Sequence, residues 1–285
     1  MSSCTNCSLR FRAAFTRALP NRGMNVAAVE GLPEVRPGDD VAAQIAEQVD
    51  LRPDDVVCVA STIVSKAEGR QRDLDEYEAG AHARSIAQRV SELAGEEKDP
   101  RFAQAVIEAS EELLIDHPIM LAVTPFGHIT VNAGIDRSNL PDADLLVLPE
   151  DPGASAQALH EELDARVVVT DTSGRPFRYG QRGVALGWAG LPAARDWRGE
   201  YDREGKELEA TVQAVVDELA AAANLVTGEG DGGTPVAVIR DWDFGDHAGS
   251  DSLFREPEDD IVRRALTAWG GGDDWGTDDD TEGAA

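Results

Sequence analysis

Two short runs of apolar, mostly β-branched residues constrain the fold of this 285-residue chain more than any other feature. Residues 55–61 read Asp-Val-Val-Cys-Val-Ala-Ser, and residues 167–170 are a second run of the same kind. Continuous apolar runs of this length are expected of strands buried on both faces. Both runs are therefore predicted to be buried strands, in a chain long enough to form a sizeable core.

Helical patterns lie between the predicted strands. Asp39 and Asp40 precede Val41, Ile45 and Val49, whose spacing of four predicts a capped amphipathic helix. Further helices are predicted at residues 76–94, 101–114, 153–163, 206–226 and 257–269. Further strands are predicted at residues 118–123, 128–133, 145–148, 184–189 and 235–239. Because helices interleave with strands, some of them paired as hairpins, the predicted fold is mixed α/β with parallel and antiparallel sheets.

The charge of the chain narrows the class of partner. It has 54 acidic and 26 basic residues, for a net charge of -28, and only three of the basic residues are lysines. Neither a nucleic-acid backbone nor an anionic membrane is attracted to so negative a surface, so neither is expected as a partner. Acidic, lysine-poor surfaces suit a cytoplasm with molar salt, which is the favoured interpretation. A generally acidic cytosolic protein is the alternative.

Cysteine usage and hydropathy indicate the compartment. Three cysteines cannot form a disulfide framework, so a reducing interior is expected. Cys4 and Cys7 resemble half of a zinc motif, but no second pair follows at zinc spacing. No apolar run approaches the ~20 residues that span a bilayer, and a cytoplasmic protein is expected. The ordered part is predicted at residues 24–269, as one unit or two subdomains, between a disordered leader (1–23) and a disordered acidic tail (270–285).

Two polar turns follow strand-like runs, and each carries an aspartate. Residues 131–139 read Val-Asn-Ala-Gly-Ile-Asp-Arg-Ser-Asn, and residues 169–175 read Val-Thr-Asp-Thr-Ser-Gly-Arg. Each aspartate alone is more often an ordinary turn residue. Together the two turns supply an oxygen set that suits Mg2+ or Mn2+ and not zinc. This set consists of Asp136, Asn139, Asp171 and Thr172. Arg175 and Arg178 follow closely and would neutralise phosphate charge.

Two further segments suit an anionic ligand. Residues 61–69 place two hydroxyls and Lys66 directly after a buried strand, although a solvated loop lysine is equally compatible and the Walker A frame is missing. The glycine-rich residues 227–234 form either a helix C-cap with a flexible loop or a backbone that approaches a nucleotide. In the second case Glu229 offers another metal oxygen.

In this order and at these separations, the segments resemble the coenzyme F-420-0:L-glutamate ligase family of archaea and actinobacteria. The resemblance extends from about residue 24 to residue 241. The matching stretches are Val29-Glu30-Gly31-Leu32-Pro33, residues 61–70, residues 132–139, Thr170-Asp171-Thr172 with Gly174-Arg175, and Gly228-Glu229-Gly230. Several such blocks in sequence are far more specific than any one of them.

The resemblance implies a GTP-dependent amide ligase. In the family, GTP phosphorylates the terminal carboxylate of the deazaflavin substrate coenzyme F-420-0, and the amine of L-glutamate then attacks the acyl phosphate. A second round adds a gamma-linked glutamate. Metal and cationic groups stabilise the transferred phosphoryl, and no protein nucleophile is needed. The resemblance also implies a homodimer with a mixed α/β fold of its own, one or two Mg2+ or Mn2+ ions, and help from K+.

Carried over position by position, the resemblance implies the ligand contacts. The residues that would contact GTP are Leu32, Pro33, Glu34, Val35, Ser61, Thr62, Lys66, Asn139, Thr227, Gly228, Glu229, Gly230, Asp231, Gly232, Gly233 and Thr234. The residues that would hold the metal are Asp136, Asp171, Thr172 and Glu229. Glu34 and Val35 stand where an apolar pair is expected, so Glu34 is expected to contact GTP through its backbone only.

Two other functions stay open. A non-catalytic deazaflavin- or nucleotide-binding module would bind its ligand without releasing phosphate when glutamate is present. A metal-dependent phosphohydrolase would release phosphate without needing glutamate. Omission of each reaction component in turn distinguishes all three functions.

Overall fold

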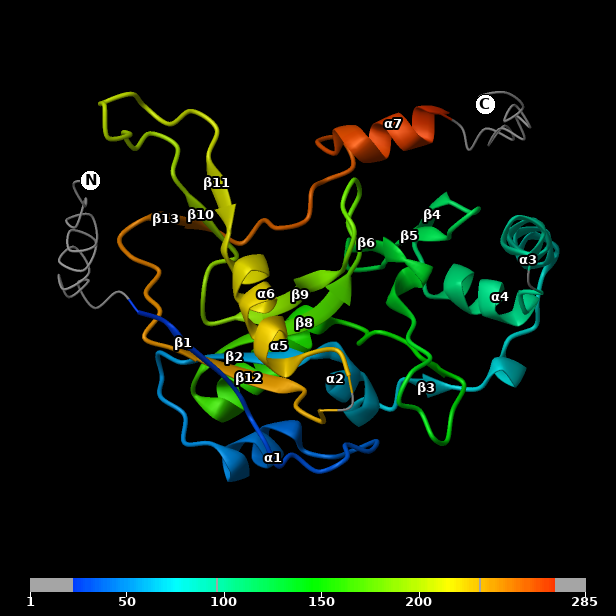
Figure 1. Cartoon of the computed structure of the whole chain (residues 1–285), viewed down its shortest axis with the longest axis horizontal. Helices are drawn as coiled ribbons and strands as arrows, with labels where there is room; N and C mark the ends of the chain where they lie inside the picture. Colours follow the sequence, from blue (N-terminus) through cyan, green and yellow to red (C-terminus); the bar gives the residue numbers. More distant parts are fainter. Residues whose placement is uncertain (1–22, 96, 231, 270–285) are drawn as a thin grey trace, which may run out of the picture.

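A five-stranded mixed sheet forms the centre of the molecule, with strand order β1-β12-β2-β8-β9 (Figure 1). Its strands are β1 (Asn25–Ala28), β2 (Val56–Ala60), β8 (Arg166–Ser173), β9 (Arg182–Ala189) and β12 (Val236–Arg240). The β2–β8 pair is parallel, whereas the other three pairs are antiparallel. The two apolar runs are thus neighbouring buried strands, and the predicted mixed α/β fold is confirmed.

This computed structural model describes residues 23–95, 97–230 and 232–269. The leader expected at residues 1–23, apart from Gly23, and the tail expected at residues 270–285 lie outside the described residues. The same holds for Cys4 and Cys7.

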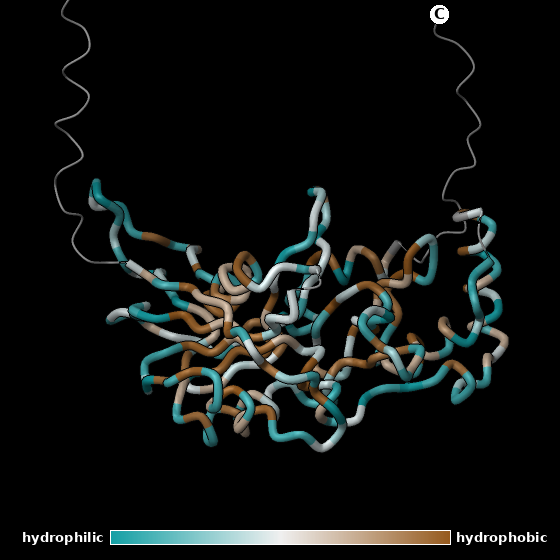
Figure 2. The backbone as a smooth tube through the Cα atoms, turned by 60° about the horizontal axis from the view of Figure 1, so that its bottom comes forward, coloured by the Kyte–Doolittle hydropathy of each residue, from teal (hydrophilic) through white to brown (hydrophobic). Residues whose placement is uncertain are grey.

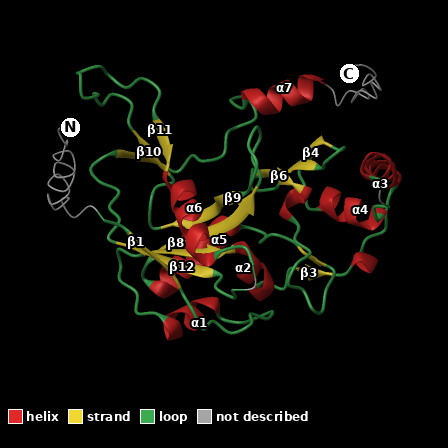
Figure 3. Ribbon diagram, viewed as in Figure 1, coloured by secondary structure: helices red, strands yellow, loops and turns green. Residues whose placement is uncertain are grey.

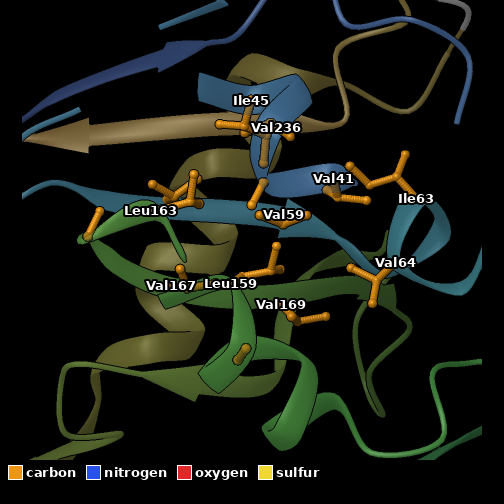
Figure 4. Packing of buried hydrophobic residues seen from close by; sticks show 14 of the residues in the cluster. Val41, Ile45, Val59, Ile63, Val64, Leu159, Leu163, Val167, Val169 and Val236 are labelled. Carbon is orange, nitrogen blue, oxygen red and sulfur yellow. The ribbon is translucent and has the colours of Figure 1, made fainter. Parts of the chain in front are cut away.

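Helices cover both faces of the central sheet because its strands alternate their apolar side chains between the faces. Val57 and Val59 pack on one side and Val56 and Cys58 on the other. Figure 4 shows the first of these clusters, with Val59, Val167 and Val169 of the sheet packed against Ile45, Ile63 and Leu159 of the helices. The first side is covered by α1 (Val41–Gln48), α2 (Ser61–Ala67) and α5 (Pro152–Leu163), and the second by α6 (Val215–Thr227). We call this sheet with its four helices the large lobe.

A second hydrophobic cluster, with Ile86, Val106 and Leu145 fully buried, forms what we call the small lobe. It consists of β3 (Gln71–Arg72), η1 (Leu74–Glu76), α3 (Ala81–Ala94), α4 (Pro100–Glu108), β4 (Glu112–Ile115), β5 (Leu121–Val123), β6 (Ile129–Val131), η2 (Asn132–Gly134) and β7 (Leu145–Leu146). Strands β4, β5 and β6 form one antiparallel sheet, and β3 pairs with β7. The domain boundaries before residue 24 and after residue 269 stay predictions.

The remaining elements lie at the periphery, where Figure 3 shows long loops between short strands. They are β10 (Ala194–Asp196), β11 (Val212–Ala214), β13 (Ala248–Ser250) and α7 (Ile261–Trp269). The first three form a small antiparallel sheet. Helix α7 reaches the small lobe, where the Arg263 Nε donates to the Glu112 Oε2 at 3.1 Å.

The helices predicted from residues 76 and 257 begin later, at Ala81 and Ile261. Two other predicted helices are wrong because part of their length forms strand. Residues 206–214 belong to a turn and to β11, because Gln213 pairs with Arg195 across the small sheet and Asp202 accepts hydrogen bonds from the backbone N–H groups of Glu204 and Lys206. The helix predicted at 101–114 ends at Glu108, and residues 112–115 form β4. In both cases strand pairing overrides helix propensity.

Hydrophobic residues concentrate inside the molecule, and hydrophilic residues lie mostly at its outer edge (Figure 2). Across residues 23–95, 97–230 and 232–269, no helix has both the length and the apolar character needed to cross a membrane.

Candidate active site

A cavity of about 470 Å³ opens where the parallel strands β2 and β8 end. The carboxyl ends of parallel strands are the usual place for a ligand in α/β sheets. Its walls come from both lobes: residues 32–35, the start of α2, the turn after η2, the end of β8, and the loop after α6. Segments more than 200 residues apart in the chain thus meet around one space.

Helix α2 forms the wall nearest the sheet. Ser61 follows β2 directly and is 2% exposed, and its Oγ donates to the Asp171 Oδ1 at 3.3 Å. This contact is possible because Ala60 and Thr170 pair at the ends of the two parallel strands. The segment that carries the hydroxyls is therefore a helix, where the sequence suggested a loop.

Lys66 lies in the last turn of α2 and is only 8% exposed, which excludes a solvated loop lysine. Its Nζ is 2.5 Å from the Glu34 Oε1, and the Glu34 side chain is largely exposed. Among the described residues, Lys66 is the one cationic side chain that lines this cavity. Glu34 also lines the cavity. That it would contact GTP through its backbone only stays a prediction.

Asp171 is positioned by an irregularity in the central sheet. Val169 pairs with Gly187 but Thr170 pairs with Ala185, so Leu186 is an extra residue opposite the end of β8. Bulges of this kind re-aim side chains near active sites. Burial raises the pKa of Asp171 to about 6, although its hydrogen bonds from the Thr172 N–H and Ser61 act in the opposite direction.

The negative charges of Asp136 and Glu229 add to the upward shift of the Asp171 pKa. Asp136 and Glu229 therefore both act electrostatically on Asp171, although the three carboxylates come from three distant segments. A cation bound among them would relieve this repulsion.

Asp136 comes from the small lobe, on a strained turn. Asn132, Ala133 and Gly134 have φ values of 56°, 53° and 71°, so three successive residues are left-handed. For the two that are not glycine this costs about 1–2 kcal/mol each, and such strain is typical of functional sites. The backbone of Asp136 exchanges hydrogen bonds with Leu146, which anchors the turn to β7.

Ser138 holds the side chain of Asp136. Its backbone N–H donates to the Asp136 Oδ1 at 2.8 Å, and its Oγ donates to the Asp136 Oδ2 at 2.9 Å. Sequence reasoning did not select Ser138, although Asp-x-Ser is a common pattern for a turn in which the aspartate accepts from the residue two positions on.

Glu229 lines the cavity from the loop after α6. Its Oε1 accepts hydrogen bonds from the Thr172 Oγ1 at 2.9 Å and the Asn224 Nδ2 at 2.5 Å. The Thr234 Oγ1 donates to the Thr227 carbonyl at 3.1 Å, which holds the two ends of the loop together. Sequence reasoning also missed Asn224, which no local pattern distinguishes from other polar residues of α6.

The oxygen groups around the cavity, which are carboxylates and hydroxyls, fit a hard cation by their chemistry. Cys58 also lines the cavity, but its buried thiol donates to the Leu219 carbonyl. In the described parts of the chain, however, no three Asp, Glu, His or Cys side chains are close enough to hold an ion as they stand. Each of the three carboxylates instead accepts a hydrogen bond from a neighbouring hydroxyl or amide.

Most of the residues selected from the sequence line this one cavity. They are Leu32, Pro33, Glu34, Val35, Ser61, Thr62, Lys66, Asp136, Asn139, Asp171, Thr172, Thr227, Gly228, Glu229, Gly230, Gly233 and Thr234. Gly232 is not in the lining, and Asp231 lies outside the described residues. Arg175 and Arg178 are exposed on the β8–β9 loop and are not in the lining either.

The fold and the cavity together define a class: an α/β protein with a carboxylate- and hydroxyl-lined ligand site, and one buried lysine, at the carboxyl ends of parallel strands. Comparison with protein families narrows this class. The model of the family F420-0:Gamma-glutamyl ligase matches residues 31–241. The chain therefore belongs to the F420-0:gamma-glutamyl ligase family, a family of ligases, which confirms the resemblance seen in the sequence.

Individual relatives agree over almost their whole length. A protein named coenzyme F420:L-glutamate ligase from Haloarcula marismortui is 69% identical over 252 residues, which covers 86% of this chain and 98% of the relative. The protein of the same name from Natronomonas pharaonis is 68% identical, covering 86% and 97%. The one from Archaeoglobus fulgidus is 43% identical, covering 85% and 98%. The first two organisms are halophilic archaea, which fits the acidic composition.

Proposed function

We propose that this chain adds L-glutamate to coenzyme F420-0 in a GTP-dependent reaction through an acyl-phosphate intermediate. A first and then a gamma-linked glutamate are added, and each round releases GDP and phosphate. The observation that carries the proposal is one cavity lined by a buried lysine and by three carboxylates from both lobes, two of which act electrostatically on the third, Asp171. The names of the family and of its relatives support the substrates.

The chain's own groups have distinct tasks in this reaction. Lys66 supplies a fixed positive charge for the phosphates of GTP, whose remainder lies against residues 32–35 and the loop at 227–234. Asp136, Asp171, Thr172 and Glu229 would hold one or two Mg2+ or Mn2+ ions. Such ions would neutralise phosphate charge. We include K+ as an activating ion in the proposal.

The bonds of the proposed reaction balance in two steps. First, a carboxylate oxygen of the acceptor forms a bond to the γ-phosphorus, and the bond between that phosphorus and GDP breaks. Second, the amine nitrogen of glutamate bonds to the acyl carbon, phosphate leaves, and the amine loses a proton. Lys66 stabilises the charge on the transferred phosphoryl in the first step, where electrostatic groups contribute most. Arg175 and Arg178 are proposed for the same task if the β8–β9 loop moves towards the cavity.

An omission assay tests this function. The reaction contains GTP, Mn2+, coenzyme F420-0 and glutamate, each left out in turn, and product mass is measured together with GDP. The expected result is a mass increase by one and then two glutamate units only in the complete mixture. Phosphate release without glutamate would instead identify a phosphohydrolase. Binding without any turnover would identify a non-catalytic module.

The homodimer and the cytoplasmic location also belong to the proposal. The loop between β8 and β9 projects from the body of the molecule (Figures 1 and 2). Its Phe177 and Tyr179 side chains are fully exposed, which is unusual for a monomer and suits burial against a second copy. Sedimentation in molar KCl is expected to give twice the mass of the chain. A monomer at micromolar concentration would contradict the dimer.

A further inference from the structure

A second cavity of about 480 Å³ adjoins the first on its small-lobe side. The two cavities share a boundary, because eight described residues line both of them, among them Asp136, Asp171, Thr172 and Glu229. The nucleotide proposed for the first cavity therefore accounts for only one side of these carboxylates. The space on their other side has no assigned ligand.

The second cavity differs from the first in its chemistry. Ser65, Thr130, Asn132, Ser173 and Gln181 line only the second cavity and offer neutral hydroxyl and amide groups. Within the described part of the chain, no lysine or arginine lines it, whereas Lys66 lines the first. A triphosphate favours the cavity with the fixed cation. Neutral donors suit a ligand with fewer charges, such as a single carboxylate with polar groups behind it.

Two buried hydroxyls in the second cavity are poorly satisfied by the protein. Thr130 of β6 and Ser173 of β8 are 6% and 8% exposed, and their Oγ atoms are 3.5 Å apart. Ser173 also reaches the Gly174 carbonyl, at 3.3 Å. Hydroxyl hydrogen bonds are normally about 2.7–2.8 Å long, so both contacts are weak. Buried hydroxyls without a strong partner are available to a ligand.

The position of this cavity matches what phosphoryl transfer requires. The attacking oxygen and the leaving oxygen lie roughly in line, on opposite sides of the phosphorus. With GTP on the Lys66 side of the carboxylates, the attacking oxygen has to approach from the other side, which is the second cavity. This argument rests on the proposed function.

We propose that the second cavity binds the carboxylate-bearing end of the acceptor, with Thr130 and Ser173 as specificity-determining contacts. Their hydroxyls donate to the acceptor from opposite lobes, because β6 belongs to the small lobe and β8 to the large one. Acceptor binding would thereby hold the two lobes at the spacing that the shared carboxylates need.

Substitution of the two hydroxyls tests the proposal. Ser173→Ala and Thr130→Val are each expected to raise the KM for the acceptor roughly tenfold, the effect of a lost hydrogen bond to a charged group. The KM for GTP should stay within about twofold of the wild type, since neither residue lines the first cavity. Thr130→Ser, which keeps the hydroxyl, should restore the acceptor KM and so covers the case in which Thr130→Val does not fold.

Ser110→Ala is the matched control, because it removes a part-buried small-lobe hydroxyl that bonds to the Val106 carbonyl away from both cavities. Calorimetric titration of coenzyme F420-0 into the GDP-bound protein gives a second readout without turnover, and the same tenfold loss is expected. A raised KM for GTP with an unchanged acceptor KM, or no change in either, would overturn the inference. A wild-type protein that adds no glutamate at all would refute the proposed function instead.

Discussion

Asp171 and Asp136 reach the same cavity from very different supports. Asp171 lies near the end of β8, an inner strand of the five-stranded sheet, and Val167, Val168 and Val169 before it are fully buried. Asp136 follows a left-handed turn of the small lobe and is held by Leu146 and Ser138. The large lobe provides a fixed carboxylate, whereas the small lobe provides one whose position depends on a strained turn and on how the lobes meet.

Because of this difference, substitutions that remove a reacting group can be distinguished from substitutions that only move one. A change at either carboxylate removes a group that the proposed reaction needs. A change in the small lobe away from the carboxylates would move Asp136, Thr130 and the second cavity together. It would leave Asp171 and Lys66 in place, because both belong to the large lobe.

The largest effect is expected for Asp171→Asn and Asp136→Asn. Each removes a charge that the proposed metal site needs, without changing core volume, so turnover should fall about 100- to 1,000-fold while the melting temperature changes little. Product mass and GDP release measure the loss, and circular dichroism checks the fold. If Asp136→Asn alone keeps wild-type turnover, the small lobe does not contribute to the reaction and the comparison fails.

The junction of the lobes is expected to be sensitive to pH through His128. Its ring lies 6.0 Å from Phe254, whose ring is 6.2 Å from Trp188 of β9, and in the described residues its Nε2 has no hydrogen-bond partner. Burial lowers the pKa of His128 to about 4 from its usual 6.5. Protonation therefore favours the unfolded chain. His128 therefore causes no loss of stability above pH 6.5, and its own contribution lowers the stability by about 3 kcal/mol as pH decreases to 4. The raised pKa of Asp171 acts in the opposite direction over the same range.

Urea unfolding at constant KCl and several pH values measures this loss. His128→Phe, which cannot take up a proton, should gain about 3 kcal/mol of stability relative to the wild type between pH 6.5 and 4. A difference between the two proteins that does not change with pH would show that His128 is not the group responsible.

A smaller effect is expected at the turn that aims Asp136. In Gly134→Ala the new Cβ would lie 2.4 Å from the Leu148 Cδ1, at a φ of +71°. Overpacking and the left-handed backbone together should cost about 2 kcal/mol and lower kcat/KM. Gly95→Ala is the control, because Gly95 has nearly the same φ of +70° but no atom within 4 Å of its Cβ. Equal losses of stability in the two variants would show that packing against Leu148 contributes nothing to the cost.

The smallest effect is expected in the large lobe, at Glu34. Its exposed carboxylate forms an ion pair with the Lys66 ammonium, so the phosphates of GTP have to displace this carboxylate before they can contact Lys66. Glu34→Gln should lower the KM for GTP about threefold, in line with the small energies of exposed ion pairs. Glu150→Gln is the control, since Glu150 pairs with Arg70 away from the first cavity. A raised KM for GTP in Glu34→Gln would show that the carboxylate assists binding.

Local patterns predicted the central elements because their signals are strong and short in range. Residues 56–60 and 167–170 are strands in the structure, as their apolar runs predicted. Asp40 caps α1 and accepts from the Ala43 N–H, as its position before the helix predicted. The helix predicted at 206–226 is wrong in its first half, because Gln213 obtains a strand partner that is remote in the chain.

The sequence by itself determined the buried strands, the polar turns at their ends and the resemblance to a ligase family, because each depends on residue types in a local order. Only the tertiary structure decided that Lys66 is buried against Glu34, that Ser61 bonds to Asp171, and that Asp136 reaches the same cavity from another lobe. It also decided that the carboxylates separate two cavities of different chemistry. Burial, pKa shifts and hydrogen bonds between remote segments arise only when the chain is packed, and a linear pattern does not contain them.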